Sequence, residues 1–275
     1  MKGLINFDMD SWWASLGMVN KVIKRENDII IEKSIPRILK LLNSYNIKST
    51  FFVLGPDVEN QTELYKKIIK EGHEIGNHTY SHFHDLKKGQ TRKIKEEIKK
   101  SHDIIQDKLK VTPIGFRAPN YSFSKKLIPL LKKAGYIYDS SIVPTFIPYY
   151  YPFHWLFKST KPNKLYTTKN NQRFSLLEIP ISVSPLTKIP MTGTFVKLLG
   201  ERWLEWNTKL LKKTGFININ FHARDFVPDL PIQNNMPFFV YKNNKNITYL
   251  LKSSISYLAK NTQTTTLQNF SEKYL

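Results

Sequence analysis

The chain has 275 residues, enough for one large domain whose core needs neither disulfides nor a structural metal. It contains no cysteine, which excludes a disulfide framework, thiolate metal sites and cysteine nucleophiles, so any metal must be held by histidine, aspartate, glutamate or water. A formal charge of +20, from 42 Lys and Arg against 22 Asp and Glu, would attract polyanions, although abundant Lys, Asn and Ile also explain it as a compositional habit.

Apolar periodicity predicts alternating strands and helices over the first 140 residues. The expected strands cover 3–8, 49–55, 73–78 and 114–119, and the expected helices cover 32–45, 59–72, 88–110 and 126–136. This alternation predicts βα units around a mainly parallel sheet. It continues more weakly with strands at 176–182 and 216–223, a helix at 201–213 and a final helix at 246–261.

The segment 143–157, VPTFIPYYYPFHWLF, is rich in aromatic residues and proline and fits neither period. A hydrophobic flap over a site, a dimer contact, a membrane-surface patch and a packed irregular loop all remain open for it. Without an internal repeat or a linker, the pattern predicts one domain over 1–275. This domain would carry an aromatic insertion near 143–165 and a C-terminal helical tail near 245–275.

The apolar run after Lys2 is too short for a signal peptide, and charged residues interrupt it. No segment has the run of apolar residues that spans a bilayer. We therefore expect a soluble, cytoplasmic protein.

Two aspartates close the first expected strand, in the sequence FDMD. Residues two apart in a strand point to the same side, so Asp8 and Asp10 should project together while Phe7 and Met9 face the other way. Two carboxylates on one face are costly unless a cation or hydrogen bonds compensate their charge. The pair therefore indicates a functional site, with a turn or helix cap as the structural alternative.

His78 and His82, in GNHTYSHFH, stand four residues apart. On a helical turn this spacing puts both imidazoles on one face, where they would chelate one metal. With Asp10 they would form a three-ligand site that leaves a position for water. His73 and His84 lie off this spacing and are interpreted as surface residues or as neighbours of the ligands.

Arg117 and His222 stand at the ends of two further expected strands, in FRAP and FHARDF. An arginine can form a two-pronged bond with a carboxylate, and the C-terminal ends of parallel strands carry the chemistry of βα folds. Singly, each of these residues is more often structural. Their order along the chain favours a common site.

In this order the motifs resemble the polysaccharide deacetylase family, the NodB-homology carbohydrate esterases. The matching segments lie between residue 3 and about residue 230, and they are NFDMDS, IKSTFFVLG, GHEIGNHTYSH, GFRAPNYS, GYIYDSS, LLEIP and NFHARDF. The resemblance implies an α/β fold, an irregular (β/α) barrel of about seven mainly parallel strands.

The resemblance also implies roles for individual residues. Asp10 would be the metal carboxylate and His78 and His82 the other ligands of one divalent metal per chain, with zinc as the expected ion. Asp8 would be the catalytic base and Arg117 would orient it. His222 would be the general acid. In relatives the backbone after Asp139 lies near the pocket.

The first motif departs from the usual Thr-Phe-Asp-Asp-Gly because Met9 separates the two aspartates. This Asp-X-Asp form resembles the branch with cytoplasmic peptidoglycan-deacetylase-like and allantoinase-like members. Some members of that branch act on cyclic or formyl amides, and some have lost the metal.

We therefore expect a metal-dependent hydrolase that removes an N-acetyl group from an amino sugar in a glycan or in its nucleotide- or lipid-linked precursor. A phosphate-linked substrate would suit the positive charge, and peripheral contact with an anionic membrane or a homo-oligomer would be compatible with the aromatic segment. The alternatives are a hydrolase of a cyclic ureide or N-formyl group on the same fold and, more remotely, a non-catalytic binder of polyanions. The complete set of polar positions argues against the binder, so no nucleic-acid partner is expected.

Overall fold

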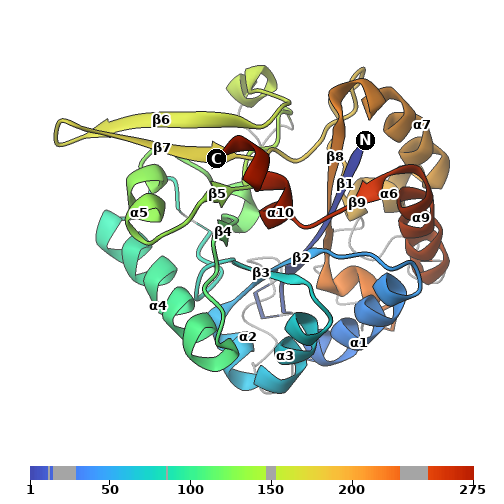
Figure 1. Cartoon of the computed structure of the whole chain (residues 1–275), viewed down its shortest axis with the longest axis horizontal. Coiled ribbons are helices and arrows are strands. Elements are labelled where there is room, and N and C mark those ends of the chain that lie inside the picture. The colour runs from blue at the N-terminus through green and yellow to red at the C-terminus, as the bar shows by residue number, and fades with distance from the viewer. Residues whose placement is uncertain (12, 15–28, 85, 147–152, 230–246) are drawn as a thin grey trace.

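The computed structural model describes residues 1–11, 13–14, 29–84, 86–146, 153–229 and 247–275 (Figure 1). Its strands form one sheet in the order β6-β7-β5-β4-β3-β2-β1-β8, with β9 paired to β1. The pairings are parallel except that of β6 with β7. The strands are β1 (Lys2–Met9), β2 (Thr50–Val53), β3 (Glu74–Asn77), β4 (Gly115–Phe116), β5 (Tyr138–Asp139), β6 (Asn163–Lys169), β7 (Gln172–Glu178), β8 (Phe216–His222) and β9 (Gln263–Thr264).

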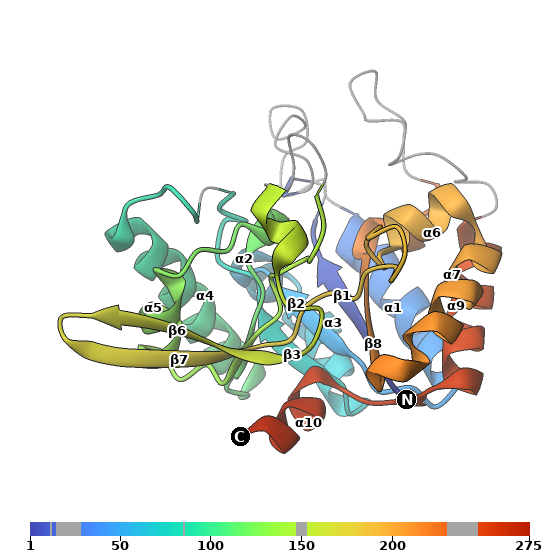
Figure 2. The same cartoon turned by 90° about the horizontal axis from the view of Figure 1, so that it is seen from above.

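Most of the helices form an outer layer around the curved sheet (Figures 1 and 2). They are α1 (Ile30–Asn43), α2 (Gly55–Asn60), α3 (Thr62–Lys70), α4 (Thr91–Leu109), α5 (Leu127–Lys133), α6 (Gly193–Leu199), α7 (Glu201–Leu211) and α9 (Ile247–Asn261). A further short helix, α10 (Leu267–Ser271), starts where β2 and β3 begin, because the Leu267 N–H donates to Thr50 Oγ1 and the Gln268 N–H to Glu74 Oε2.

The expected α/β architecture with a mainly parallel, barrel-like sheet is confirmed, but the sheet is not closed. Its two edge strands, β6 and β8, are not paired with each other. The segment that connects β7 to β8 bonds to the free edge of β8, because the Ser182 N–H donates to the Asn218 carbonyl at 2.9 Å and Thr192 forms an isolated parallel bridge with Asn220. Because the sheet is closed only in part, the barrel is irregular.

Alternation along β1 and β8 separates an apolar outer face from a polar inner face. Ile5, Phe7 and Met9 of β1 belong to the core that packs under the helices, together with Ile217, Ile219 and Phe221 of β8. The residues between them, Asn6, Asp8, Asn218, Asn220 and His222, form the inner face, where the first four are joined by hydrogen bonds. The inner face is apolar at the N-terminal ends of the strands, where Leu4, Phe52 and Tyr138 pack with Leu267 and Phe270 of α10.

The sequence missed two features of the second half. The hairpin of β6 and β7 was expected only as a strand at 176–182, whereas β7 covers Gln172–Glu178 and β6 precedes it. Helix α6 was not predicted. Residues 147–152 of the aromatic segment lie outside the described residues; within it, Trp155 is buried in the core around α5, whereas Phe157 is exposed.

Within the described ranges, none of the helices combines the length and the apolar composition that crossing a bilayer requires.

Candidate active site

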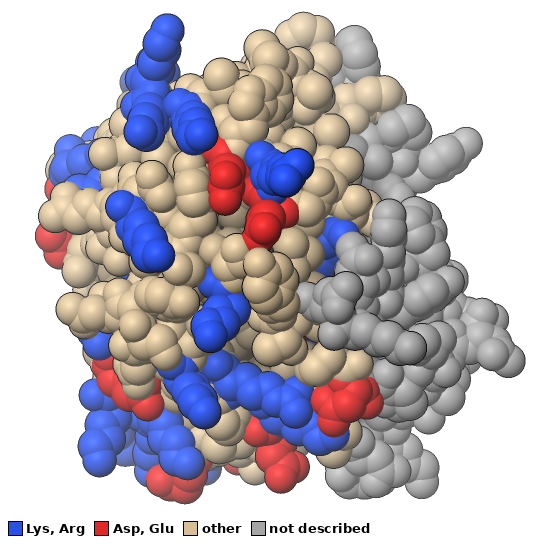
Figure 3. Space-filling view, turned by 90° about the vertical axis from the view of Figure 1, so that its right-hand side faces the viewer, with Lys and Arg blue, Asp and Glu red and all other residues tan. Residues whose placement is uncertain are grey.

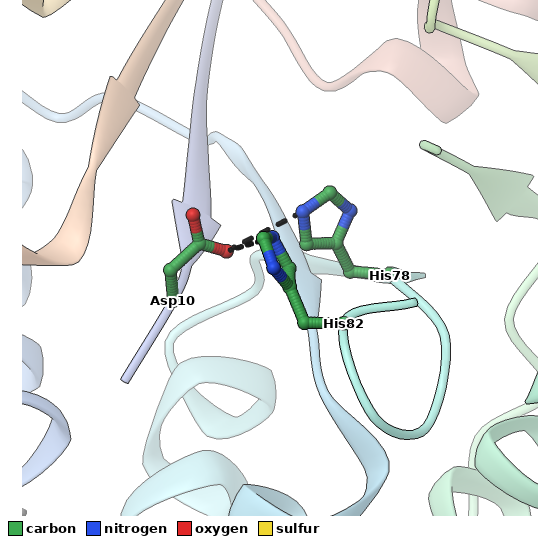
Figure 4. A group of neighbouring side chains, drawn as sticks. All are labelled: Asp10, His78 and His82. Carbon is green, nitrogen blue, oxygen red and sulfur yellow. Dashed lines mark ion pairs between the residues drawn. The ribbon is translucent and has the colours of Figure 1, made fainter. Parts of the chain in front are cut away.

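Asp10, His78 and His82 converge beyond the C-terminal ends of β1 and β3 (Figure 4). Asp10 Oδ1 lies 3.3 Å from His78 Nε2 and 3.5 Å from His82 Nε2. The three candidate ligand atoms all lie within 4.8 Å of one another, and all three residues are buried. Two imidazole nitrogens and a carboxylate oxygen form a donor set that suits a divalent transition metal.

The spacing of the two histidines predicted that a helical turn would bring them together, but the structure has no helix there. Residues 78–84 follow β3 as an irregular loop, in which Thr79 and His82 have positive φ angles of 73° and 53°. The left-handed conformation is uncommon for residues with a side chain and is typical of functional sites, where surrounding contacts hold it. Here it turns the loop back so that the imidazole rings lie 5.1 Å apart.

The hydrogen bonds of His78 leave its Nε2 free to bind a metal. Its Nδ1 lies 2.8 Å from the Arg117 carbonyl, which can only accept, so Nδ1 carries the hydrogen and Nε2 points at Asp10. Burial opposes a charge on His78, but the carboxylates of Asp8 and Asp10 outweigh it and raise its pKa. A proton and a metal ion would therefore compete for Nε2, and metal affinity should fall as the pH is lowered.

His82 provides the test of whether the site fits a metal. Burial lowers the pKa of His82 to about 3, so its imidazole is neutral at pH 7. Among the described residues neither of its ring nitrogens has a hydrogen-bond partner. Because a buried polar atom without a partner is costly, the arrangement fits a bound metal better than a structural histidine.

Asp8 lies on β1 beside the cluster and is held on both carboxylate oxygens. Its Oδ1 accepts from Arg117 Nη1 at 2.8 Å and its Oδ2 from Asn220 Nδ2 at 2.8 Å. Arg117 is fully buried and also donates to Asn6 Oδ1 at 2.5 Å and to the Ser140 carbonyl at 2.8 Å. Arg117 therefore compensates the Asp8 charge and links β1 to the segment after β5 and to β8.

His222 ends β8 on the opposite side of the two aspartates. Its Nε2 lies 4.0 Å from Asp8 Oδ2 and 3.8 Å from Asp10 Oδ2. The backbone N–H of His222 donates to Asp225 Oδ2 at 3.0 Å, and Asp225 forms a buried ion pair with Lys197 of α6 at 2.5 Å. The position of the imidazole is thus set by a strand end and by a carboxylate that a lysine holds in place.

Burial lowers the pKa of His222 to about 4, and the Arg224 cation acts in the same direction, against the opposing effects of Asp10 and Asp8. His222 is therefore neutral at pH 7 until negative charge develops near it. A reaction that places an oxyanion in the site would supply that charge.

Asp139, whose role the sequence left open, does not contact the metal ligands. It holds the segment that binds Arg117. It accepts from the Ser141 hydroxyl at 2.6 Å, while Glu178 accepts from the Ile142 N–H at 2.8 Å. Burial raises the pKa of both carboxyls, and the proximity of Asp139 further raises that of Glu178. The pair anchors the segment in which Ser140 accepts the bonds of Arg117.

The predictions for the two other histidines of the motif have different outcomes. His73 is buried rather than on the surface, and it is not near the ligands, because its Nδ1 accepts from the Ser49 N–H at 3.2 Å before the start of β2. His84 is a neighbour of a candidate ligand, since its ring stands edge-on to that of His82 at 4.7 Å.

Sequence reasoning missed the asparagines that line the inner face, Asn6, Asn218 and Asn220. Their signal was present in LINFD and FININFH, where a polar amide replaces an apolar residue at alternate positions of a buried strand. Buried amides need partners, so such a pattern indicates a hydrogen-bonded network inside the barrel.

Residues 22–138 match the family model described as polysaccharide deacetylase. This part of the chain is therefore similar to polysaccharide deacetylases. The matched range includes His78, His82 and Arg117, whereas Asp8, Asp10 and His222 lie outside it. For these three residues the geometry described above carries the argument for a shared site.

Two relatives of this chain have named activities. A peptidoglycan deacetylase from Helicobacter pylori is 39% identical over 121 residues, which is 43% of this chain and 41% of the relative. A peptidoglycan-N-acetylglucosamine deacetylase from Bacillus cereus is 34% identical over 101 residues, or 37% of this chain and 46% of the relative. The chain thus spans less than half of the length of both.

A solved structure from Mycobacterium smegmatis, named for the polysaccharide deacetylases, has the same fold as this chain. It superimposes with a TM-score of 0.69 over 99% of this chain and 89% of its own, at 18% sequence identity. The likeness extends beyond the range of the family model to 99% of this chain, so the two proteins share the fold of the whole barrel.

Proposed function

We propose that the protein is a metal-dependent hydrolase that removes an N-acetyl group from an amino sugar in a glycan or in its nucleotide- or lipid-linked precursor. One observation carries the proposal: three candidate metal ligands lie beside an aspartate and a histidine that could transfer protons. Asp8 Oδ2 and His222 Nε2 are 4.0 Å apart, next to Asp10. The named activities of the H. pylori and B. cereus relatives support the same chemistry.

Asp10, His78 and His82 would hold the metal, and zinc is the ion that two imidazoles and one carboxylate suit best. When bound, such an ion acts as a Lewis acid that polarises an amide carbonyl and acidifies water. The three ligands leave room for water or substrate, as in catalytic rather than structural zinc sites.

The remaining residues divide the proton transfers. Asp8, paired with Arg117, would accept a proton from the water that attacks the acetamide carbonyl. As negative charge develops on the carbonyl oxygen, it favours transfer of that proton from Asp8 to His222, whose Nε2 lies 4.0 Å from Asp8 Oδ2, and His222 would then donate it to the departing amine. The C–N bond breaks, and the products are acetate and a free amino sugar.

The positive net charge of the protein supports a substrate that lies close to an anionic membrane. With a formal charge of +20, the protein would be attracted to a phosphate-linked sugar and to the anionic lipid that carries one. We therefore include, as part of the proposal, a cytoplasmic protein with peripheral contact at the inner membrane face.

The direct experiment is a panel of substrates, with release of acetate or formate, or opening of the ureide ring, as the readout. The panel comprises N-acetylglucosamine oligomers, their nucleotide- and lipid-linked precursors, a cyclic ureide and N-formyl amides. Acetate from an acetylated amino sugar is the expected result. Turnover of only the ureide or the formyl amides would replace the proposal with the alternative hydrolase, and no turnover at all would contradict both.

The two aspartates should separate cleanly in the same assay. Asp8→Asn is expected to lose turnover and keep its metal, because Asp8 pairs with Arg117 and Asn220 instead of the two imidazoles. Asp10→Asn is expected to lose the metal, because Asp10 Oδ1 is the atom that faces both His78 and His82. The opposite pattern in metal analysis would reverse the assignment.

A further inference from the structure

The hydrogen-bond partners of Asn220 allow only one orientation of its side-chain amide. Its Oδ1 lies 2.9 Å from Arg117 Nη1. A guanidinium can only donate, so the amide oxygen must face Arg117 and the NH₂ group must face away from it. That NH₂ group donates to Asp8 Oδ2 at 2.8 Å and to the Tyr121 hydroxyl at 2.7 Å.

This orientation gives Asp8 a second fixed contact. Arg117 binds Asp8 Oδ1 from the segment after β4, and Asn220 binds Asp8 Oδ2 from β8. One contact would leave the carboxylate free to rotate about that bond, whereas two contacts from different elements fix its plane. Asn220 itself lies on a rigid strand that pairs with β1 in register, with Asn6 opposite Asn220.

Tyr121 completes the arrangement at a cost in backbone strain. Asn120 and Tyr121 both have positive φ angles, 50° and 53°. For a bulky side chain this conformation is rare and persists where surrounding contacts enforce it. Here it carries the phenol into the barrel, where its ring is buried and its hydroxyl oxygen accepts from Asn220.

We propose that Asn220 is a positioning residue that holds the Asp8 carboxylate in the plane from which it takes a proton from the attacking water, and that Tyr121 fixes the Asn220 amide. The inference rests on the proposed function, because it gives Asp8 the role of base. It adds a residue that acts through Asp8 and that had no role in the sequence-based expectations, although the segment NFHARDF begins with it.

The test compares steady-state kinetics of acetate release by Asn220→Ala, Asn220→Asp and a matched control, Asn218→Ala. Asn218 lies two residues earlier on the same face of β8, and its amide donates to Ser140 Oγ and to the Ile179 and Pro180 carbonyls rather than to Asp8. The control therefore removes a comparable set of buried hydrogen bonds. Melting temperature and metal content are measured for every variant.

We expect Asn220→Ala to lower kcat by about 10²-fold with KM and metal content unchanged, because a misplaced catalytic group costs turnover and not ground-state binding. Asn220→Asp keeps an acceptor for Arg117 but loses the donor to Asp8, so it should lose at least as much. Tyr121→Phe removes only the hydroxyl and should lower kcat by a smaller factor. Asn218→Ala should lower the melting temperature without this loss of kcat.

Three results would overturn the inference. Wild-type kcat in a folded Asn220→Asp protein would show that the donor is not needed. An equal loss of kcat in Asn218→Ala would show that any damage to the polar network has the same effect. If the wild-type protein releases no acetate, the proposed function fails and the inference fails with it, an outcome that the wild-type reaction alone identifies.

Discussion

Two buried carboxylates in and beside the site each pair with a cation from a different part of the chain. Asp8 pairs with Arg117 at 2.8 Å and Asp225 with Lys197 at 2.5 Å. Burying an isolated charge is prohibitive, and removing one partner of a buried pair destabilises a protein by about 3–5 kcal/mol. Variants of Arg117 or Lys197 therefore report on folding as well as catalysis, which is why substitutions of similar shape are the more informative probes.

His222 is the residue whose removal should affect turnover with little effect on the fold. It lies at the end of β8, where 15% of its side chain is exposed, beyond the core residues Ile219 and Phe221 that pack the strand against the helices. We expect kcat to fall by about 10²–10⁴-fold, the usual contribution of a general acid. His102→Ala on α4 is the control, because that imidazole bonds to the Tyr136 hydroxyl instead of the site. Full activity of His222→Ala would make FHARDF a structural strand end.

We expect His73 to make the free energy of unfolding depend on pH. Burial, reinforced by the Lys48 cation, lowers the pKa of His73 from 6.5 to about 4, so the folded protein holds it neutral. The unfolded chain binds the proton more readily; the contribution is therefore complete above pH 6.5 and is lost as the pH falls from 6.5 towards 4. The slope for one such proton is at most about 1.4 kcal/mol per pH unit.

Urea unfolding of wild type and His73→Asn at about pH 7.5 and about pH 5 measures this slope. The asparagine oxygen can still accept from the Ser49 N–H, whose bond to His73 Nδ1 is 3.2 Å long. The variant should lose less stability between the two pH values than the wild type does. Equal losses would show that His73 does not titrate in this range.

At the scale of elements, the strands carry the site and the loops after them complete it. Asp8 and His222 belong to β1 and β8, whereas Asp10, His78, His82 and Arg117 stand one to five residues beyond the ends of β1, β3 and β4. This is the edge at which parallel βα folds bind ligands, because the strand ends meet there.

The opposite end of the sheet is closed by α10, and Glu74 is the residue that attaches it. The Glu74 carboxylate accepts from the Thr50 hydroxyl at 2.6 Å, the Tyr138 hydroxyl at 2.6 Å and the Gln268 N–H at 2.9 Å. We expect Glu74→Ala to lower the free energy of unfolding by about 3 kcal/mol, because it leaves buried donors without an acceptor. Urea denaturation measures the change.

Glu63→Ala is the control for Glu74→Ala, since the Glu63 side chain is 81% exposed and its ion pair with Lys66 lies on the surface. Its free energy of unfolding should stay within about 0.5 kcal/mol of the wild-type value. If the two variants are equally stable, the attachment of α10 does not depend on Glu74.

The elements that could be predicted from the sequence are those with a regular period. The buried strand 3–8 and the amphipathic helices around 32–45 and 88–110 correspond to β1, α1 and α4. The irregular loop of His78 and His82 could not be predicted, because it depends on positive φ angles at Thr79 and His82 that no glycine marks. The hairpin of β6 and β7 was hidden because its outer strand alternates between exposed and half-buried residues and has no apolar face.

The candidate residues could be named from the sequence only through the order of the motifs. The barrel brings distant positions together. Asp8 and Arg117 are 109 residues apart in the sequence, and Arg117 and Asn220 are 103 residues apart. Local patterns carry no information about such distant contacts. Asn220 was missed for this reason, although its alternation in FININFH was visible.

At the scale of the whole molecule, positive charge is dispersed over the face that Figure 3 shows. On the face formed by α7, α9 and their surroundings, Lys and Arg side chains are scattered, with acidic side chains between them (Figure 3). A dispersed excess of positive charge attracts anionic surfaces without requiring one binding patch, and the attraction is screened beyond a Debye length of about 8 Å at physiological salt.

If the substrate is held at an anionic membrane, the protein should bind vesicles that contain anionic lipid and release them as salt is raised. Each Lys or Arg near such a surface contributes about 1 kcal/mol. Co-sedimentation with anionic and with neutral vesicles over a salt series measures the effect. Equal binding to both, or none at low salt, together with full activity on a soluble acetylated sugar, would show that the charge of +20 is a compositional habit.

The central claim, that Asp10, His78 and His82 hold a metal on which deacetylation depends, is tested most directly by zinc titration of the metal-stripped protein with acetate release as the readout. The account predicts no acetate from the stripped protein and activity that rises with added zinc and levels off at about one ion per chain. His78→Ala and His82→Ala should show no such restoration. Undiminished acetate release by the stripped protein, or restoration in both variants, would contradict the account.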